Sequence, residues 1–235
     1  MNQPTAWTEN VVNPMGHSTI AALFDLDHTL LDTSSGRLYA RYIYRQGQIG
    51  QTELVRVAWW NLITKLGLLD MASVIPKLLA NAVGEDEAAM RELCDRWFAS
   101  DVLPHLTERG QARVRWHQAQ GHTVALVSAS TQYVVRPMAD YLGIPGQFVC
   151  THLVSVDGRL TGEVEPPMCY GEGKVVWAER FAAEWGVDLS ASTFYTDSIS
   201  DLPLLERVGQ PVAVNPDPKL RRLAQKRGWP VERFY

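Results

Sequence analysis

The sequence predicts an α/β protein in which a parallel β-sheet is covered by helices on both faces. Short apolar runs alternate with helical patterns along most of the chain, and one long segment breaks this alternation. Three of the apolar runs end directly on a polar residue, namely Asp25, Ser128 and Asp197. Because ligands of such sheets bind beyond the carboxyl ends of the strands, we expect these three residues to share a site.

The strands are predicted from apolar runs that are too short for helices and typical of buried strands. These runs occupy residues 20–24, 123–127, 193–196 and 211–214. Helical periodicity between and after them predicts helices over residues 108–120, 132–142, 175–185, 203–207 and 219–227. A β-hairpin is predicted over residues 153–164, where apolar and polar residues alternate around Asp157 and Gly158.

Residues 33–104 break the alternation, because four helical patterns follow one another there without a convincing strand. The patterns cover residues 38–45, 53–66, 72–82 and 87–98. We therefore predict a loose polar tail at 1–17, a core formed by 18–32 and 105–235, and a helical insertion at 33–104 that packs over the site. Trp59 and Trp60 are expected to pack inside the insertion, with an apolar substrate pocket as the alternative.

The composition restricts the class of protein. The chain has 235 residues and a formal net charge of −4, so no global basic field attracts nucleic acid. Three scattered cysteines are atypical of a disulfide framework or a zinc site and favour a reducing cytoplasm. No signal peptide is expected, and no membrane span either, because Arg56, Asn61 and Lys65 interrupt the richest apolar stretch at 55–69.

Two carboxylates stand at the end of the first predicted strand, in the motif FDLDHTL at residues 24–30. Asp25 and Asp27 are two residues apart, so both can face one ligand. One carboxylate can bind a hard cation and attack phosphorus, while the other can pass a proton to the leaving oxygen. The alternative is that both aspartates only cap a loop.

Two later motifs offer groups that bind phosphate. Ser128, Ala129 and Ser130 follow the second predicted strand at the expected start of a helix, where a hydroxyl and free amides can form a phosphate cradle. An ordinary helix N-cap at Ser128 is the alternative. Lys174 follows the glycine-containing stretch at 170–173 and can place a positive charge opposite phosphate, unless it is only a solvated helix charge.

The last motif is YTDSISD at residues 195–201, directly after the third predicted strand. Asp197 and Asp201 are spaced by one helical turn, so both can point at one Mg²⁺ ion and its water molecules. The alternatives are that Asp197 caps a helix and that Asp201 has a structural role.

These motifs, in this order, resemble the haloacid dehalogenase (HAD) superfamily, subfamily IB, in its phosphoserine-phosphatase-like and histidinol-phosphatase-like members. The resemblance covers most of the chain outside the tail and the inserted helices. It implies a Rossmann-like HAD core with an inserted helical cap of the C1 type. Dehalogenating members lack the second aspartate, so the presence of Asp27 favours phosphate chemistry.

The resemblance also implies roles for individual residues. Asp25 would form an aspartyl-phosphate, and Asp27 would protonate the leaving group and then activate water. Mg²⁺ would be held by Asp25, Asp197 and the backbone carbonyl of Asp27, with Ser198 and Asp201 around them. Lys174 would orient Asp25 as a catalytic residue. The phosphate-binding residues would be Thr29, Ser128, Ala129, Ser130 and Lys174.

The implied function is hydrolysis of a small phosphate monoester by a Mg²⁺-dependent phosphatase of the cytoplasm, acting as a monomer or homodimer. A phosphotransferase or mutase on the same core, and a non-catalytic phosphate-ester-binding module, are the alternatives. We expect no nucleic-acid partner.

The substrate is less constrained. Phosphoserine phosphatases place a glutamate shortly after the first motif to hold the substrate amine, but Ser34 stands there in this chain. The stretches at 195–206, 215–218 and 227–230 are similar to bacterial members that resemble histidinol-phosphate phosphatases. Histidinol phosphate is therefore the first substrate candidate, followed by phosphoserine or a lysophospholipid. Contacts of His28, Cys169 or Arg37 with the substrate are left open.

Overall fold

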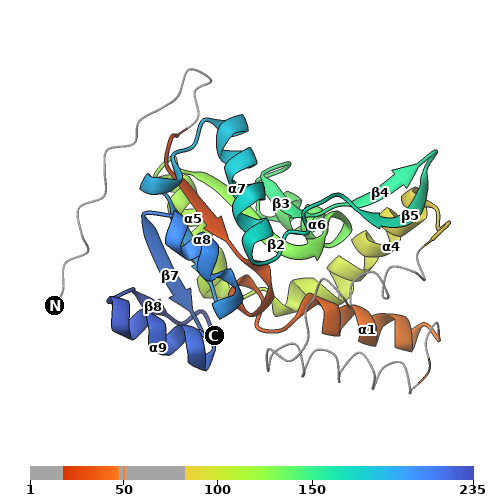
Figure 1. Ribbon diagram of the computed structural model, residues 1–235. Coiled ribbons are helices and arrows are strands. Elements are labelled where there is room, and N and C mark those ends of the chain that lie inside the picture. Colours follow the sequence, from red (N-terminus) through yellow and green to blue (C-terminus); the bar gives the residue numbers. More distant parts are fainter. Residues whose placement is uncertain (1–17, 48–49, 51–82) are drawn as a thin grey trace.

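The computed structural model describes residues 18–47, 50 and 83–235, which form a six-stranded sheet flanked by helices (Figure 1). The strand order is β3-β2-β1-β6-β7-β8, and every neighbouring pair is parallel. The strands are β1 Ala21–Phe24, β2 Thr123–Thr131, β3 Phe148–Thr151, β6 Thr193–Thr196, β7 Gln210–Val214 and β8 Val231–Glu232. The predicted α/β fold with a parallel sheet is confirmed.

Strand β1 lies in the middle of the sheet, between β2 and β6. Phe24 pairs with Leu126 on one side and with Tyr195 on the other. All four residues of β1 are fully buried, because a central parallel strand is covered on both faces. The chain therefore delivers the next residue, Asp25, to the centre of the carboxyl edge of the sheet.

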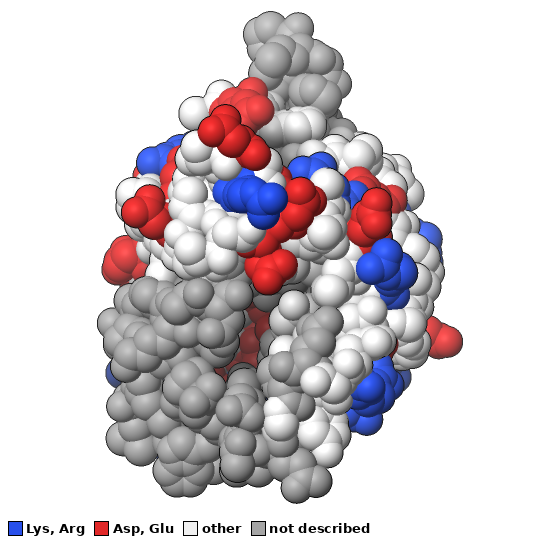
Figure 2. Space-filling model, turned by 90° about the vertical axis from the view of Figure 1, so that its right-hand side faces the viewer, with Lys and Arg blue, Asp and Glu red and all other residues white. Residues whose placement is uncertain are grey.

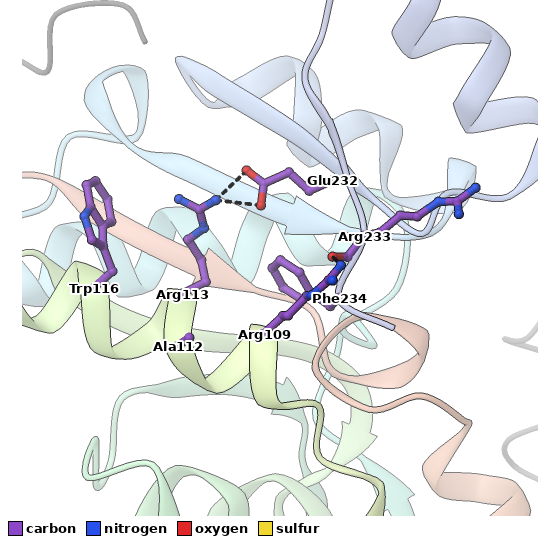
Figure 3. A pocket seen from close by; sticks show the side chains of 7 residues that line it. All are labelled: Arg109, Ala112, Arg113, Trp116, Glu232, Arg233 and Phe234. Atoms are coloured by element: carbon purple, nitrogen blue, oxygen red, sulfur yellow. Dashed lines mark hydrogen bonds and ion pairs between the residues drawn. The ribbon is translucent and has the colours of Figure 1, made fainter. Parts of the chain in front are cut away.

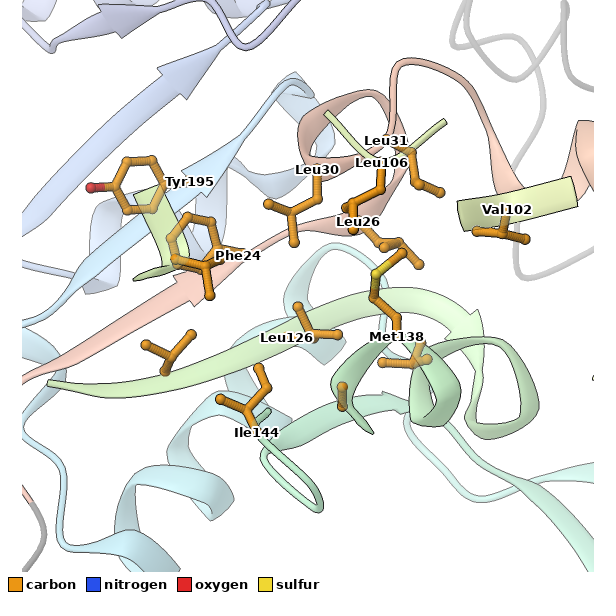
Figure 4. Close-up of a cluster of buried hydrophobic side chains, with 14 of the residues drawn as sticks. Phe24, Leu26, Leu30, Leu31, Val102, Leu106, Leu126, Met138, Ile144 and Tyr195 are labelled. Atoms are coloured by element: carbon orange, nitrogen blue, oxygen red, sulfur yellow. The ribbon is translucent and has the colours of Figure 1, made fainter. Parts of the chain in front are cut away.

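Two clusters of buried apolar side chains lie on opposite faces of the sheet, because neighbouring residues of a strand point to opposite sides. The first contains Phe24, Leu126 and Tyr195 (Figure 4), and the second contains Leu23 and Val127. The first cluster is covered by α5 Glu108–Ala119 and α6 Gln132–Tyr141. The second is covered by α7 Glu172–Trp185, α8 Leu202–Arg207 and α9 Pro218–Arg227.

Two further helices, α1 Ser35–Arg45 and α4 Glu87–Trp97, lie to one side of these layers (Figure 1). They contact each other through the rings of Tyr39 and Trp97, whose centroids are 5.4 Å apart. The predicted hairpin is confirmed as β4 Leu153–Val156 and β5 Arg159–Val164. It packs against the start of α4, where Asp86 bridges to Arg159.

The predicted strands and helices of the core are confirmed, with two changes of bounds that affect the site. Strand β2 continues through Ser128 to Thr131, and α7 begins at Glu172 instead of residue 175. Strands β3 and β8 were not predicted. β8 has only two residues, which is too short to produce an apolar pattern.

Within residues 33–104, the predicted helices at 38–45 and 87–98 are confirmed as α1 and α4. The predicted helices at 53–66 and 72–82, which include Trp59 and Trp60, lie outside the described residues, as does the tail at 1–17. The division into tail, core and cap therefore stays a prediction. Among the residues that the structure describes, no helix combines the length and apolar character that crossing a membrane requires.

Candidate active site

The candidate site forms at the carboxyl edge of the sheet, where β1 and β6 end side by side. The amide of Asp25 donates to the carbonyl of Tyr195 at 2.9 Å, which continues the parallel ladder by one residue beyond β1. Asp197 follows the end of β6 by one residue. The two aspartates that the sequence places after separate strands are therefore brought to one edge, as predicted.

Lys174 connects two aspartates of the site. Its Nζ donates to Asp25 Oδ1 and to Asp201 Oδ2, both at 2.7 Å. The side chains of Lys174 and Asp201 are each 3% exposed, so these are buried ion pairs. Burial acts to lower the pKa of Lys174, but Asp201 and Asp25 raise it above its ordinary value, and the ammonium stays charged. Thr196 completes the cluster by donating from Oγ1 to Asp201 Oδ2 at 2.6 Å.

A close backbone approach fixes the position of Lys174 in the first turn of α7. A Cβ atom added at Gly173 would lie 1.8 Å from the carbonyl oxygen of Met168, which no side chain can tolerate. Gly173 therefore lets the segment before α7 pass close to the helix. Lys174 belongs to the helix and not to a preceding loop, which corrects the predicted helix start at 175.

Asp25 and Asp197 carry more negative charge than the protein neutralises. Burial raises the pKa of Asp25 to about 7, although Lys174 opposes the shift. Burial, followed by repulsion from Asp25 and Asp201, raises the pKa of Asp197 to about 8. Asp27 and Asp201 add negative charge close to both groups, and among the described residues Lys174 is the cation that opposes it. This donor set fits a divalent cation with oxygen ligands.

The arrangement of the acidic side chains fits a metal ion that is bound by few protein side chains. Across residues 18–47, 50 and 83–235, no group of three or more His, Cys, Asp or Glu side chains is arranged as a metal cage. Mg²⁺ is typically bound by one or two carboxylates and keeps several waters. The pair Asp25 and Asp197, with a backbone carbonyl nearby in sequence, matches that pattern better than the pattern of zinc or calcium.

The backbone makes an irregular turn after Asp25, over Leu26–Leu30. His28 has a positive φ of 57°, a conformation that is uncommon for residues other than glycine. The Asn215 side chain donates from Nδ2 to the His28 carbonyl at 3.4 Å and accepts from the amide of Phe234 at 3.1 Å. Asn215 thus ties the turn to the end of the chain.

The turn directs the carboxylate of Asp27 toward the start of α1. Its Oδ1 accepts the amide of Ser35 at 2.8 Å, and its Oδ2 accepts the hydroxyls of Ser35 at 3.1 Å and Ser34 at 3.4 Å. Burial raises the pKa of Asp27, and the hydrogen bonds from Ser35 and Ser34 oppose the rise. Ser34 therefore faces Asp27 within the protein.

The predicted phosphate-binding residues are only partly where the sequence suggested. Thr29 Oγ1 donates to Asp25 Oδ2 at 3.4 Å, so Thr29 borders the site. Ser128, Ala129 and Ser130 were expected at a helix start, but they belong to the end of β2, and α6 begins at Gln132. The prediction of a helix N-terminus at Ser128 was wrong, because β2 continues past an irregularity in its pairing with β3.

The hydroxyl of Ser128 organises this strand end. It accepts the amide of Ser130 at 3.1 Å, and the hydroxyl of Ser130 lies 2.9 Å from that of Ser35. Ser128 is 2% exposed, whereas Ala129 and Ser130 are half-buried and available to a ligand. The end of β2, which carries the hydroxyls of Ser128 and Ser130, replaces the predicted helix start.

The segment after β6 is a tight turn, so the prediction that Asp197 and Asp201 lie one helical turn apart was also wrong. Ser198 precedes a short helical turn over Ile199–Asp201, and its hydroxyl accepts the amide of Ser200 at 3.2 Å. Asp201 is bound to Lys174 and Thr196 on the inside of the turn. Asp201 therefore contributes to the site by holding Lys174 in place.

Asp217 supports the same turn and had no role in the sequence-based prediction. Its Oδ2 accepts the amide of Ile199 at 2.7 Å, while its Oδ1 caps α9 by accepting the amides of Lys219 and Leu220. The Asp-Pro pair at 217–218 is a recognisable helix-start signal. That signal predicts that Asp217 caps α9, but it does not predict the contact of Asp217 with the amide of Ile199. Ser35 and Asn215, likewise unpredicted, touch the site through a turn whose shape has no sequence signature.

The residues left open by the sequence differ in exposure. Cys169 is fully buried, and burial raises the pKa of its thiol to about 12, so it packs in the protein interior. Arg37 is exposed near the start of α1. His28 is half-buried in the turn. Of these three residues, His28 and Arg37 are the two that have solvent-exposed surface.

Figure 2 shows several acidic side chains on this face of the described part of the molecule. A separate cavity of about 350 Å³ lies between α5 and the last residues of the chain (Figure 3). Its Arg113 is held by both oxygens of Glu232, at 2.9 and 2.8 Å, and none of the aspartates described above lines it. This cavity is distinct from the candidate site.

The fold and the site define a class of enzyme that comparison with known proteins identifies. The family model of the haloacid dehalogenase-like hydrolases matches residues 22–206, a range that contains Asp25, Lys174 and Asp197 and the strands from β1 to β6. The chain belongs to this family. The predicted family, and with it the predicted class of phosphoric monoester hydrolase, is confirmed.

Three similar proteins illustrate the match. A histidinol-phosphatase of Neisseria meningitidis serogroup C is 30% identical over 218 residues, which cover 91% of this chain and 98% of the relative. A phosphoserine phosphatase of Mycobacterium tuberculosis is 30% identical over 238 residues, covering 100% of this chain and 77% of the relative. A crystal structure of a protein of unknown function from Bordetella pertussis is 34% identical, with a TM-score of 0.83, covering 92% and 99% of the two chains.

Proposed function

We propose that the chain is a Mg²⁺-dependent phosphatase that hydrolyses a small phosphate monoester through an aspartyl-phosphate on Asp25. The observation that carries the proposal is the position of Asp25 at the end of the central strand, with Lys174 Nζ 2.7 Å from one of its carboxylate oxygens. The other oxygen, Oδ2, accepts a long hydrogen bond from Thr29 Oγ1, at 3.4 Å. An oriented, partly neutralised carboxylate is what an in-line attack on phosphorus requires.

The proposed reaction has two displacements. In the first, Asp25 Oδ2 bonds to phosphorus as the ester oxygen departs, and Asp27 gives that oxygen a proton. In the second, water attacks the aspartyl-phosphate, Asp27 takes a proton from the water, and Asp25 is regenerated as inorganic phosphate leaves. Lys174 keeps Asp25 in place, and its own position is fixed by Asp201.

The remaining site residues bind the phosphoryl group and the metal. Thr29, Ser128, Ser130 and the backbone at Ala129 are proposed to hold the phosphoryl oxygens. Mg²⁺ would be held by the carboxylates of Asp25 and Asp197 and the backbone carbonyl of Asp27, with Ser198 and Asp201 supporting the turn around it. When bound, the ion supplies positive charge that offsets the charge on the phosphoryl oxygens.

Histidinol phosphate is the first substrate candidate, because the Neisseria relative carries that activity in its name and aligns over nearly its whole length. Phosphoserine follows, because the Mycobacterium relative is a phosphoserine phosphatase. Against phosphoserine stands Ser34, which is 8% exposed and faces Asp27 instead of offering a carboxylate to a substrate amine. A lysophospholipid is the third candidate. We place the enzyme in the cytoplasm, as a monomer or homodimer.

The direct test replaces Asp25 by asparagine, which keeps the size of the side chain and removes its charge. We expect turnover of p-nitrophenyl phosphate to be abolished in Asp25→Asn, while the wild type loses activity in EDTA and regains it with Mg²⁺. Turnover of Asp25→Asn at the wild-type rate would contradict the nucleophile assignment. Transfer of the phosphoryl group to an added alcohol in preference to water would instead identify a phosphotransferase, and tight ester binding without phosphate release would identify a binding module.

A further inference from the structure

The start of α1 holds both oxygens of Asp27. The amide of Ser35 donates to Oδ1 at 2.8 Å, and the hydroxyl of Ser35 donates to Oδ2 at 3.1 Å. Ser35 is 2% exposed, so water does not compete for these bonds. A carboxylate whose two oxygens are both hydrogen-bonded to one residue has little freedom to rotate.

The hydroxyl of Ser35 also reaches the end of β2. It lies 2.9 Å from the hydroxyl of Ser130. A serine hydroxyl has one proton to donate, and an ionised Asp27 can only accept. When Ser35 donates to Asp27, Ser130 must therefore donate to Ser35. The result is a chain of hydrogen bonds that runs from Ser130 through Ser35 to Asp27 Oδ2.

These contacts have two possible meanings. Asp27 could simply cap α1, because the side chain of the N-cap residue Ser34 makes no capping bond to the helix and a carboxylate is favourable at a helix start. In that case the bonds would stabilise the helix. Alternatively, the helix could serve Asp27 by fixing the direction in which its proton is delivered. The contact with Ser130 favours the second meaning, since a helix cap does not need a partner at the end of β2.

We infer that Ser35 is a positioning residue that orients Asp27 for proton transfer to the leaving group and links it to the phosphate-binding end of β2. The inference rests on the proposed function, because it takes Asp27 as the general acid. The amide of Ser35, which can only donate, keeps Oδ1 in the role of an acceptor. The position of the first residue of α1 thereby determines the orientation of the Asp27 carboxyl group.

The inference predicts a dependence on the leaving group. An ester with a poor leaving group needs the proton of Asp27, whereas p-nitrophenolate departs without it. The quantity to compare is kcat/KM, which covers the steps up to departure of the leaving group and excludes the later hydrolysis of the aspartyl-phosphate. Benzyl phosphate and p-nitrophenyl phosphate are suitable substrates, because their rings are similar and their leaving groups differ greatly.

The experiment compares Ser35→Ala with the wild type on both esters in Mg²⁺. We expect kcat/KM for benzyl phosphate to fall by about tenfold or more, which is the range for losing one hydrogen bond to a charged group. For p-nitrophenyl phosphate we expect a fall of less than about threefold. Ser35→Thr keeps both the amide and the hydroxyl and should recover most of the loss.

A matched control removes a helix-start contact that lies away from the aspartates. Asp86 caps α4 by accepting the amide of Ala89 at 2.9 Å, so Asp86→Ala should lower stability without changing the ratio of the two kcat/KM values. An equal loss on both esters in Ser35→Ala would overturn the inference and leave Ser35 a structural residue.

The outcomes also separate this inference from the proposed function. If Asp25→Asn keeps wild-type turnover, the proposed function fails before Ser35 is considered. If the wild type hydrolyses p-nitrophenyl phosphate but not benzyl phosphate, the general-acid role of Asp27 is contradicted. If both esters are substrates and Asp25 is essential, an unchanged ratio in Ser35→Ala overturns the inference alone.

Discussion

Replacing Lys174 by methionine is expected to destabilise the metal-free protein strongly above neutral pH. Methionine keeps most of the length and apolar stem of lysine but removes the ammonium group. The structure shows that this group makes two buried ion pairs, to Asp25 and Asp201, each at 2.7 Å. The substitution leaves both carboxylates without their cation, in surroundings where they are poorly solvated.

The size of the effect follows from these contacts. Breaking a buried ion pair by removing one partner costs about 3–5 kcal/mol, because the other charge stays buried. Protonation of Asp25 can relieve part of the cost, since its pKa is already raised to about 7 with Lys174 present. The loss of unfolding free energy should therefore approach about 3–5 kcal/mol near about pH 8.5 and shrink as the pH falls toward about 6.

The assay is urea unfolding in EDTA, followed by tryptophan fluorescence at several pH values. Lys226→Met is the matched control, because Lys226 is exposed in the last turn of α9 and its loss should change stability by no more than about 0.5 kcal/mol. A Lys174→Met protein within about 1 kcal/mol of the wild type near pH 8.5 would refute the reasoning. So would a deficit that grows as the pH falls.

Two further predictions concern charge and packing. Because the folded-state pKa values of Asp25 and Asp197 are raised to about 7 and about 8, the contribution of these two carboxyl groups to metal-free stability is greatest at low pH and falls as the pH rises from about 4 through 8. Mg²⁺ should stabilise the protein increasingly over the same range in thermal unfolding, and a stabilisation independent of pH would contradict this. Gly173→Ala should lower both stability and activity, because its Cβ would lie 1.8 Å from the Met168 carbonyl oxygen; wild-type Tm and kcat would contradict the close approach.

The sequence predicts those parts of the site that depend on single buried strands. Asp25 and Asp197 each follow a short apolar run, which predicts a buried strand. Because parallel strands end at a common edge of the sheet, their positions could be predicted. Lys174 could be predicted as a partner from its position in the motif order. Its shared contact with Asp201 could not, because that contact depends on the tight turn after β6.

The sequence does not predict the parts that depend on irregular backbone. The polar residues after an apolar run predict a helix start at Ser128, whereas β2 continues to Thr131 beyond an irregular pairing. The contact between Asp27 and Ser35 is made beside an irregular turn in which His28 has a positive φ, a conformation that is uncommon for residues other than glycine. Pattern and propensity carry no information about such a turn.

The central claim is that the phosphoryl group passes through Asp25. The most direct measurement is acid quenching of the wild-type enzyme during turnover of p-nitrophenyl phosphate in Mg²⁺, followed by peptide mass mapping, because acyl phosphates survive in acid. The proposed mechanism predicts one added phosphoryl group on the peptide that contains Asp25, and none in Asp25→Asn. Turnover with an unmodified Asp25 peptide, or with the phosphoryl group on another residue, would contradict it.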